Sequence, residues 1–439
     1  MTLSIGKAPF WIALLAFLAT VGWMEYHILQ STNGAFTFPS DDAFIRLTIA
    51  KNLAFQKVWG ISKYEFASAS SSLLYPVLLA VAFFIFGAYP VVALAVNLAA
   101  GIALLLAVQR WLARQELPNS TQTLILLALV FLTPLPVIVV SGMEHTVQLL
   151  LCFLFITRFY KEYTTGQLSR LTYVYGALLV ANRYEGIILI AAACILLAVK
   201  KKNAVNKSGP TAFKLAFFSL LPVLIFGVIA LRKGSHFIPD PLLLRSGSPA
   251  TAFISLYLAW LIGNAIIFGG ALIAKYDQSL FKRAAVLFLG LLLAFNSFNA
   301  FQNISQASVN VYQQQYQAGQ LLHRYYYRRT AALDNIGASS FFTEARDLDL
   351  SAHQPQFLDS LNKRFRPQVA ICHDRSIFPQ LLPHWTKIAS WTIPGNVICK
   401  DPTLSIYAAD TSTSVIKYLK EHLLEFQPHL PPDITVRYY

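Results

Sequence analysis

The feature that most constrains this chain is a series of long apolar stretches that fills residues 10–300 and then stops. Stretches of this kind are typical of membrane-spanning helices, although several are shorter than the roughly 20 residues that cross a bilayer straight. The predicted spans are 9–29, 89–108, 121–140, 146–160, 171–180, 187–199, 211–231, 253–274 and 284–300. The sequence therefore predicts an all-α polytopic membrane domain over residues 1–302, with about nine spans, and a soluble domain over residues 303–439.

The composition supports a membrane protein. Hydrophobic residues make up 56% of the 439 residues and charged residues 13%, against about 45–50% and about 25% in a soluble domain. This balance excludes a disordered chain and a small domain held together by disulfides. A net charge of +14 would indicate nucleic acid binding in a soluble protein. Here the basic residues fit the cytoplasmic loops of a membrane protein, so we predict no nucleic acid partner.

The charges of the loops predict the orientation. Residues 73–86 form a shorter apolar segment, which we interpret as a half-inserted helix on the outer side. With that layout, one set of loops carries Arg110, Arg114, Arg158, Lys161, Arg170, Lys200, Lys201, Lys202, Lys207, Lys275, Lys282 and Arg283, against three acids. Positive loops face the cytoplasm, and a full crossing by 73–86 would break that rule. The C-terminal domain is therefore expected outside the cytoplasm, in a periplasm or lumen.

The first outer loop, residues 31–72, contains the adjacent acids Asp41 and Asp42. The following segment, 43–58, repeats apolar residues every fourth position, and Arg46, Lys51 and Lys57 lie elsewhere on the helical wheel, as in an amphipathic helix that lies along the membrane surface. Two adjacent acids can take different roles in general-base or metal chemistry when their surroundings separate their pKa values. The alternative is simple capping, because Ser and Asp are common at helix starts.

Further ionisable residues gather on the same predicted face, where they are costly unless paired or solvated. The candidates for substrate binding are Lys51, Glu144, His145, Arg183, Glu185, Asp240 and Arg245. Arg183 with Glu185 also fits a merely neutralised pair at the membrane boundary. Arg245 suits a lipid phosphate, and equally a side chain that reaches to the interface. Convergence of these residues predicts a cavity open to the outside.

The last 137 residues alternate between strand and helix patterns, which predicts a small α/β domain. The expected strands are 330–334, 345–350, 368–373, 387–392 and 404–408, and the expected helices are 311–327, 356–366 and 414–426. Cys372 and Cys399 would share an oxidising compartment, so we consider a disulfide between them as a hypothesis.

No Walker A loop, GxGxxG turn or HExxH motif is present. The predicted membrane domain has no evident repeated half, which disfavours a transporter.

Several short motifs resemble those of the GT-C superfamily of integral-membrane glycosyltransferases, which use polyprenyl-phosphate sugars. Nearest is the bacterial branch that includes the terminal arabinofuranosyltransferases of the mycobacterial cell wall. The matching residues are Asp41-Asp42-Ala43-Phe44-Ile45 with Lys51-Asn52-Leu53, Gly142-Met143-Glu144, Arg183-Tyr184-Glu185-Gly186, Pro239-Asp240 with Arg245-Ser246-Gly247, and Asp334-Asn335-Ile336-Gly337-Ala338. Tyr184, Asp240 and Arg245 replace Pro, Asn and Lys of the family pattern, which leaves the sugar and the acceptor open.

The resemblance implies a GT-C-like fold with interfacial helices on the outer face of a bacterial inner (cytoplasmic) membrane. It implies transfer of a sugar from a polyprenyl-phosphate donor to a hydroxyl of a glycan, lipid or protein, with Asp41 or Asp42 as general base. Arg183 and Arg245 would meet the phosphate, and Lys51 is a weaker candidate. Asp41, Asp42 and Glu144 are oxygen ligands suited to Mg²⁺ or Mn²⁺. The alternative is a non-catalytic envelope-assembly or glycolipid-binding membrane protein, and a transporter comes third.

Overall fold

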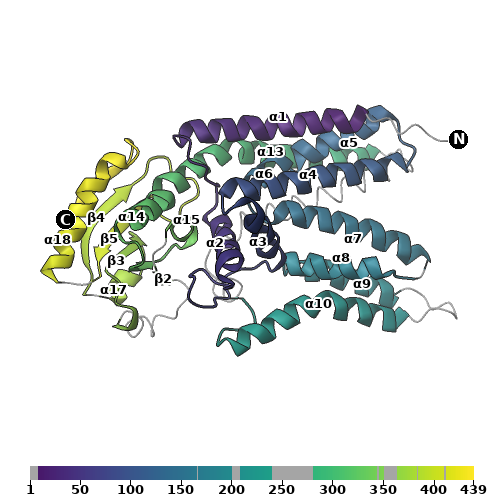
Figure 1. Ribbon diagram of the computed structural model, residues 1–439. Coiled ribbons are helices and arrows are strands. Elements are labelled where there is room, and N and C mark those ends of the chain that lie inside the picture. Colours follow the sequence, from purple (N-terminus) through teal and green to yellow (C-terminus); the bar gives the residue numbers. More distant parts are fainter. Residues whose placement is uncertain are drawn as a thin grey trace.

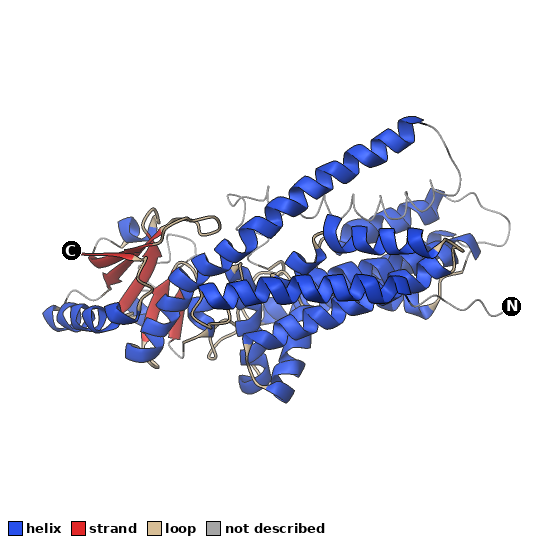
Figure 2. Ribbon diagram, turned by 90° about the horizontal axis from the view of Figure 1, so that it is seen from above, coloured by secondary structure: helices blue, strands red, loops and turns tan. Residues whose placement is uncertain are grey.

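Long helices fill most of the molecule and lie side by side, and a small sheet packs at one end of them (Figure 1). The computed structural model describes residues 8–165, 167–199, 208–239, 280–343, 346–350, 363–382, 384–409 and 412–439. Seen from above, all the strands lie at the end that holds the C-terminus, and the N-terminus lies at the opposite end (Figure 2).

The helices that lie side by side form what we call the helical layer. They are α1 (Ala8–Ser31), α4 (Pro90–Ala113), α5 (Asn119–Leu132), α6 (Leu135–Val140), α7 (His145–Thr165), α8 (Arg170–Asn182), α9 (Gly186–Val199), α10 (Ser208–Arg232) and α13 (Leu280–Val311). Within the described ranges, three segments are long and apolar enough to cross a membrane: α1, α4 and Pro210–Arg232 of α10. The chain is thus consistent with a membrane protein, and a count of nine spans stays a prediction. The predicted span 253–274 lies outside the described residues.

Two features explain why two of the expected spans, 121–140 and 171–180, do not qualify. The expected span 121–140 is divided into α5 and α6 at Thr133-Pro134, because proline cannot donate its backbone nitrogen to the preceding turn. Helix α8 has 13 residues, and at 1.5 Å per residue it reaches about 20 Å, less than the roughly 30 Å of a hydrocarbon core.

The turns between helices alternate between the two ends of the layer. The turns that join α4 to α5 and α7 to α8 lie at the end that holds the N-terminus, and those that join α6 to α7 and α8 to α9 lie at the end nearer the sheet (Figure 1). The predicted inner-loop residues Arg114 and Arg170 are therefore at one end, and the predicted outer-loop residues Glu144, Arg183 and Glu185 are at the other. This grouping of the turns agrees with the predicted layout, and which end faces the cytoplasm stays a prediction.

Two shorter helices, α2 (Asp41–Gln56) and α3 (Leu74–Phe86), cross the ends of the long helices between the layer and the sheet (Figure 1). Both segments were expected to be helical. Helix α3 buries Tyr75, Leu79 and Phe83 and exposes Phe84 and Phe86. Before α3, the Ser70 hydroxyl bonds to the backbone of Ser72 on both its donor and acceptor sides, a turn typical of serine-rich linkers.

The C-terminal part contains one mixed six-stranded sheet with the order β2-β1-β3-β5-β4-β6. Its strands are β1 (Thr330–Leu333), β2 (Arg346–Asp349), β3 (Val369–His373), β4 (Thr386–Thr392), β5 (Thr403–Ala408) and β6 (Thr435–Tyr438). Strands β2, β1 and β3 are parallel, and the remaining pairs are antiparallel. The five predicted strands are confirmed to within one residue at their shared ends, and β6 is an additional edge strand.

Helices α14 (Gln317–Tyr325) and α18 (Thr413–Phe426) pack together and contribute to the core on one face of the sheet. The remaining short helices of this part are η1 (Tyr312–Tyr316), α15 (Gly337–Phe341), α17 (Phe378–Leu381) and η3 (Gln427–His429). The expected helix 414–426 is α18. Most of the expected helix 356–366 lies outside the described residues. The proposed disulfide is wrong for this structure: Cys372 is a buried thiol in β3, and Cys399 is a separate thiol whose Sγ lies 3.7 Å from Nε2 of Gln315.

The two parts share apolar cores. Ile49 of α2 packs in the core of the sheet, while Phe341 of α15 packs with Phe44 in the core of the helical layer. Helix α13 runs without a break through the predicted boundary at residue 302. The junction between the helical layer and the sheet is therefore built by α2 and α15 together.

Candidate functional site

Glu144 is the centre of the most highly charged buried cluster among the described residues. It lies in the turn between α6 and α7 and is 0% exposed. Its Oε2 lies 2.6 Å from Nε of Arg46, and its Oε1 accepts hydrogen bonds from Arg46 Nη2 at 3.1 Å and Arg183 Nη1 at 2.9 Å. Burial alone would raise the pKa of this carboxyl, but the two arginines outweigh it and hold the pKa at about 2. Glu144 is therefore ionised near neutral pH.

Arg183 links Glu144 to the other acid of the cluster. It follows α8 and donates to both carboxylate oxygens of Glu185, at 2.7 and 3.2 Å. Its Nη1 also lies 2.9 Å from Nδ1 of His145. Burial raises the pKa of Glu185, but the charge and hydrogen bonds of Arg183 together with a backbone hydrogen bond lower it, and the net shift is downward. Arg183 and Glu185 are therefore in contact, and because Arg183 also binds Glu144 the two residues are not an isolated pair.

The turn that carries Glu144 is held from several sides. The Tyr75 hydroxyl donates to the carbonyl of Gly142 at 2.9 Å, and the Asn97 amide donates to that of Met143 at 3.0 Å. The Asn182 amide donates to the carbonyl of Glu144 itself at 3.2 Å. Gly142 has a φ of 70°, and a Cβ atom there would overlap the ring of Phe38. Only glycine meets both demands without strain.

Arg46 connects this cluster to the predicted acid pair. Its Nη1 donates to the backbone carbonyl of Asp42 at 2.6 Å, and its Nη2 donates to Ser71 at 3.0 Å. The sequence pattern placed Arg46 away from the apolar side of an interfacial helix. In the structure it is 4% exposed, because α2 is covered by the helical layer on that side. The first turn of α2 and the turn at Glu144 are consequently fixed to each other.

Asp41 bonds to the sheet part rather than to its own helix. Its carboxylate accepts the backbone N–H of Ala338 at 2.7 Å and of Gly337 at 3.0 Å, at the start of α15. Ser40, at the N-cap position of α2, makes no side-chain cap bond. Simple capping of α2 by Ser40 is therefore not what the structure has. Burial raises the pKa of Asp41 to about 6, and the nearby Asp42 adds to this, while the two N–H groups and His373 oppose it.

Lys51 belongs to a different neighbourhood. Its Nζ donates to the carbonyl of Phe341 at 3.1 Å, and it lines a pocket between α2 and α15. Asp240 and Arg245 lie outside the described residues. The structure thus brings Glu144, His145, Arg183 and Glu185 together in one cluster. Asp41 and Asp42 join it through Arg46, and Lys51 stands apart.

Two of the three expected metal ligands, Asp41 and Glu144, already have partners at both carboxylate oxygens. Both oxygens of Glu144 contact arginine, and both oxygens of Asp41 accept backbone N–H groups. In the part of the chain that the structure describes, no three His, Cys, Asp or Glu side chains gather as a ligand set. A requirement for Mg²⁺ or Mn²⁺ stays a prediction, and no step below depends on it.

Sequence reasoning missed a buried pair at the carboxyl ends of β1 and β3. His373 Nδ1 lies 3.1 Å from Asp334 Oδ1, and the backbone N–H of His373 donates to Asp334 Oδ2 at 2.9 Å. Because β1 and β3 are parallel neighbours, residues that follow them meet at one edge. That rule, applied to the predicted strands, could have found the pair.

Comparison of the chain with protein-family models, curated proteins and solved structures finds no match.

Proposed function

We propose that this chain is a membrane glycosyltransferase of the GT-C type, which transfers a sugar from a polyprenyl-phosphate donor to an acceptor hydroxyl. The observation that carries the proposal is the junction described above. Arg46 and Arg183 bind the same carboxylate, and so join the three loops whose motifs resemble that family. In the proposed topology of about nine spans, this junction and the sheet lie outside the cytoplasm.

The proposed reaction assigns the general base to the acid pair. Asp41 or Asp42 takes the proton of the acceptor hydroxyl, whose oxygen bonds to the anomeric carbon of the sugar. The bond from that carbon to the phosphate oxygen breaks, and polyprenyl phosphate leaves with the electron pair. The pKa of Asp41, raised to about 6 by burial, suits a base that works near neutral pH.

The contacts refine the roles of the other candidates. Glu144 has both oxygens engaged by arginine, so we assign it to positioning rather than to substrate. Arg183 already meets two carboxylates, and this weakens its assignment to the leaving phosphate. His145, Glu185 and Lys51 remain candidates for substrate contact, and the acceptor is a glycan, lipid or protein.

One observation favours the alternative, a non-catalytic envelope-assembly or glycolipid-binding protein. Asp41 and Glu144, the acids central to the proposal, both have structural partners at each oxygen. A non-catalytic scaffold requires only these structural contacts of the two acids. An enzyme requires at least one acid of the pair to reach substrate.

The test compares the envelope glycans of a deletion strain of the source organism with those of complemented strains, by mass spectrometry at matched protein levels. The complementing genes encode wild type, Asp41→Asn, Asp42→Asn, and Glu421→Asn as an exposed acid control. We expect a sugar that disappears in the deletion and returns with wild type and the control, but not with at least one acid-pair variant. Full restoration by both acid-pair variants would favour the scaffold.

A further inference from the structure

A polar pocket opens where α2 and α15 meet, away from the Glu144 cluster. Its volume is about 200 Å³, and Thr48, Lys51, Asn52, Phe55, Gln56, Ile61, Ser62, Lys63, Ser340 and Thr343 line it. These residues come from both parts of the molecule, since Ser340 and Thr343 belong to α15 and the loop after it. The pocket therefore lies at the junction of the two parts.

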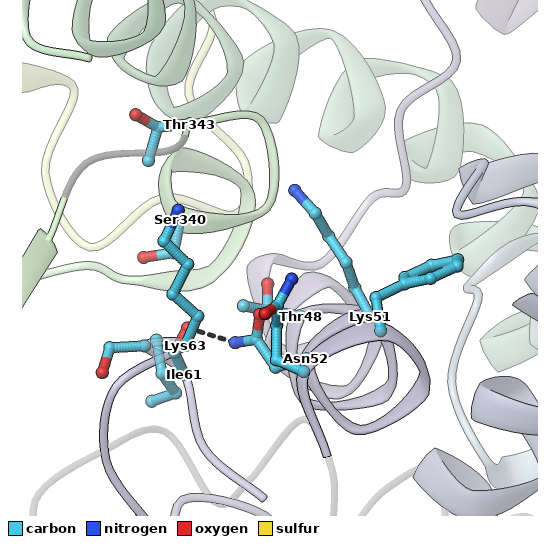
Figure 3. Close-up of a pocket in the computed structure, with 10 residues that line it drawn as sticks. Thr48, Lys51, Asn52, Ile61, Lys63, Ser340 and Thr343 are labelled. Atoms are coloured by element: carbon cyan, nitrogen blue, oxygen red, sulfur yellow. Dashed lines mark hydrogen bonds between the residues drawn. The ribbon is translucent and has the colours of Figure 1, made fainter. Parts of the chain in front are cut away.

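The charge of the lining is positive. Lys51 extends from α2 and Lys63 from the loop after it, and both side chains reach in the direction of α15 and Thr343 (Figure 3). None of the described lining residues is acidic. Lysine supplies a compact positive charge with three N–H donors, which suits a phosphate or a carboxylate.

The rest of the lining suits a ligand that carries hydroxyl groups beside its anionic group. Ser340 is 5% exposed, and its buried Oγ has no hydrogen-bond partner. A buried hydroxyl without a partner is costly, and a ligand that bonds to it removes that cost. The ring of Phe55 is half exposed at the pocket and offers an apolar surface to the C–H face of a sugar.

From these observations we propose that the pocket binds a single sugar residue that carries a carboxylate or a phosphate. Its volume is below the roughly 300–1,000 Å³ of pockets for drug-sized ligands, which limits the occupant to one small moiety. Lys51 and Lys63 bind the anionic group, and Ser340 and Thr343 bond to oxygens of the sugar. This binding requires no turnover, so it goes beyond the proposed glycosyl transfer and is tested without it.

The experiment measures binding to the full chain in nanodiscs by isothermal titration calorimetry. The probes are glucuronic acid, glucose 6-phosphate, inorganic phosphate and glucose. We expect the two charged sugars to bind at least tenfold more tightly than glucose or inorganic phosphate, and more weakly as NaCl increases. Equal affinity for glucose, or no binding of either charged sugar, overturns the proposal. Tight binding of inorganic phosphate alone means a plain anion site, and also overturns it.

Two variants and one control locate the site. Lys63→Gln is expected to weaken binding of the charged sugars at least tenfold, while Lys417→Gln, which removes an exposed lysine of α18, leaves it unchanged. Ser340→Ala is expected to weaken binding about threefold without lowering the melting temperature, because it removes a hydroxyl that has no partner. Unchanged affinity in both pocket variants would place the ligand elsewhere and refute the assignment.

Discussion

Arg46 and Glu144 meet inside the protein through two contacts, one of 2.6 Å between Nε and Oε2 and one of 3.1 Å between Nη2 and Oε1. Their side chains are 5% and 0% exposed. Desolvation of two charges is expensive, and mutual attraction offsets it only while both partners are present. The ion pair therefore fixes the position of α2 on the helical layer more than it adds net stability.

Glu144→Gln should be strongly destabilising, because it leaves two arginines without their shared carboxylate. We expect the free energy of unfolding to fall by about 3–5 kcal/mol, measured by denaturant unfolding of the full chain in detergent. Glu421→Gln is the matched control: its pair with Lys417 is exposed and 3.9 Å long, so its effect should stay within about 0.5 kcal/mol. Similar losses in both variants would mean that the buried cluster is not as tightly formed as described.

Gly142→Ala tests the turn that presents Glu144. The φ of 70° is unfavourable for alanine, and the added Cβ would overlap the ring of Phe38. We expect a loss of about 1–3 kcal/mol in the free energy of unfolding. Gly234→Ala is the control, since Gly234 has a similar φ of 77° but open space around it. The Gly234→Ala variant should therefore lose stability through backbone strain alone, without a steric overlap. A loss in Gly142→Ala no larger than in Gly234→Ala would contradict the predicted clash.

The sequence predicted the parts of the structure that depend on local pattern. The strands β1, β3 and β5 are short runs of apolar residues between turns, and they lie where that pattern placed them. The alternation of basic and acidic loops also predicted which turns share an end of the helical layer. Strand β6 was missed because it is a short edge strand with mostly exposed residues, and such a strand gives no apolar pattern.

The contacts that define the candidate site were not predictable in the same way. A helical wheel describes one isolated helix, so it assigned Arg46 to a polar side. Burial of Arg46 depends on Glu144, which is 98 positions away in the chain. Likewise, Asp41 was weighed as a cap of its own helix, yet it binds N–H groups of α15 almost 300 positions later. Both errors have one cause, namely that tertiary packing decides which polar groups meet.

Asp41→Ala should loosen α15 from α2. The change leaves the N–H groups of Gly337 and Ala338 without their acceptor, at a cost of about 1–3 kcal/mol. Amide hydrogen exchange in the segment 337–341 should accelerate at least tenfold, because about 1.4 kcal/mol corresponds to a factor of ten in an opening equilibrium. Asp42→Ala provides the matched control, and exchange at 337–341 should stay close to wild type. Equal acceleration in the two variants would show that the contact with α15 is not specific to Asp41.

Stability should depend on pH through Asp41 in a direction opposite to that of most carboxylates. Its pKa rises from 3.8 to about 6 on folding, so the folded state binds the proton more tightly than the unfolded chain does. The contribution of Asp41 to the free energy of unfolding is complete below about pH 4 and is lost as the pH rises through about 6. Subtracting the stability curve of Asp41→Asn from that of wild type between pH 4 and 7 removes the effects of all groups that titrate alike in the two proteins. We expect the difference to decrease with rising pH and to level off above pH 6. A flat difference, or one that increases with pH, would mean that burial does not dominate the environment of Asp41, and would remove the pKa argument for Asp41 as the base.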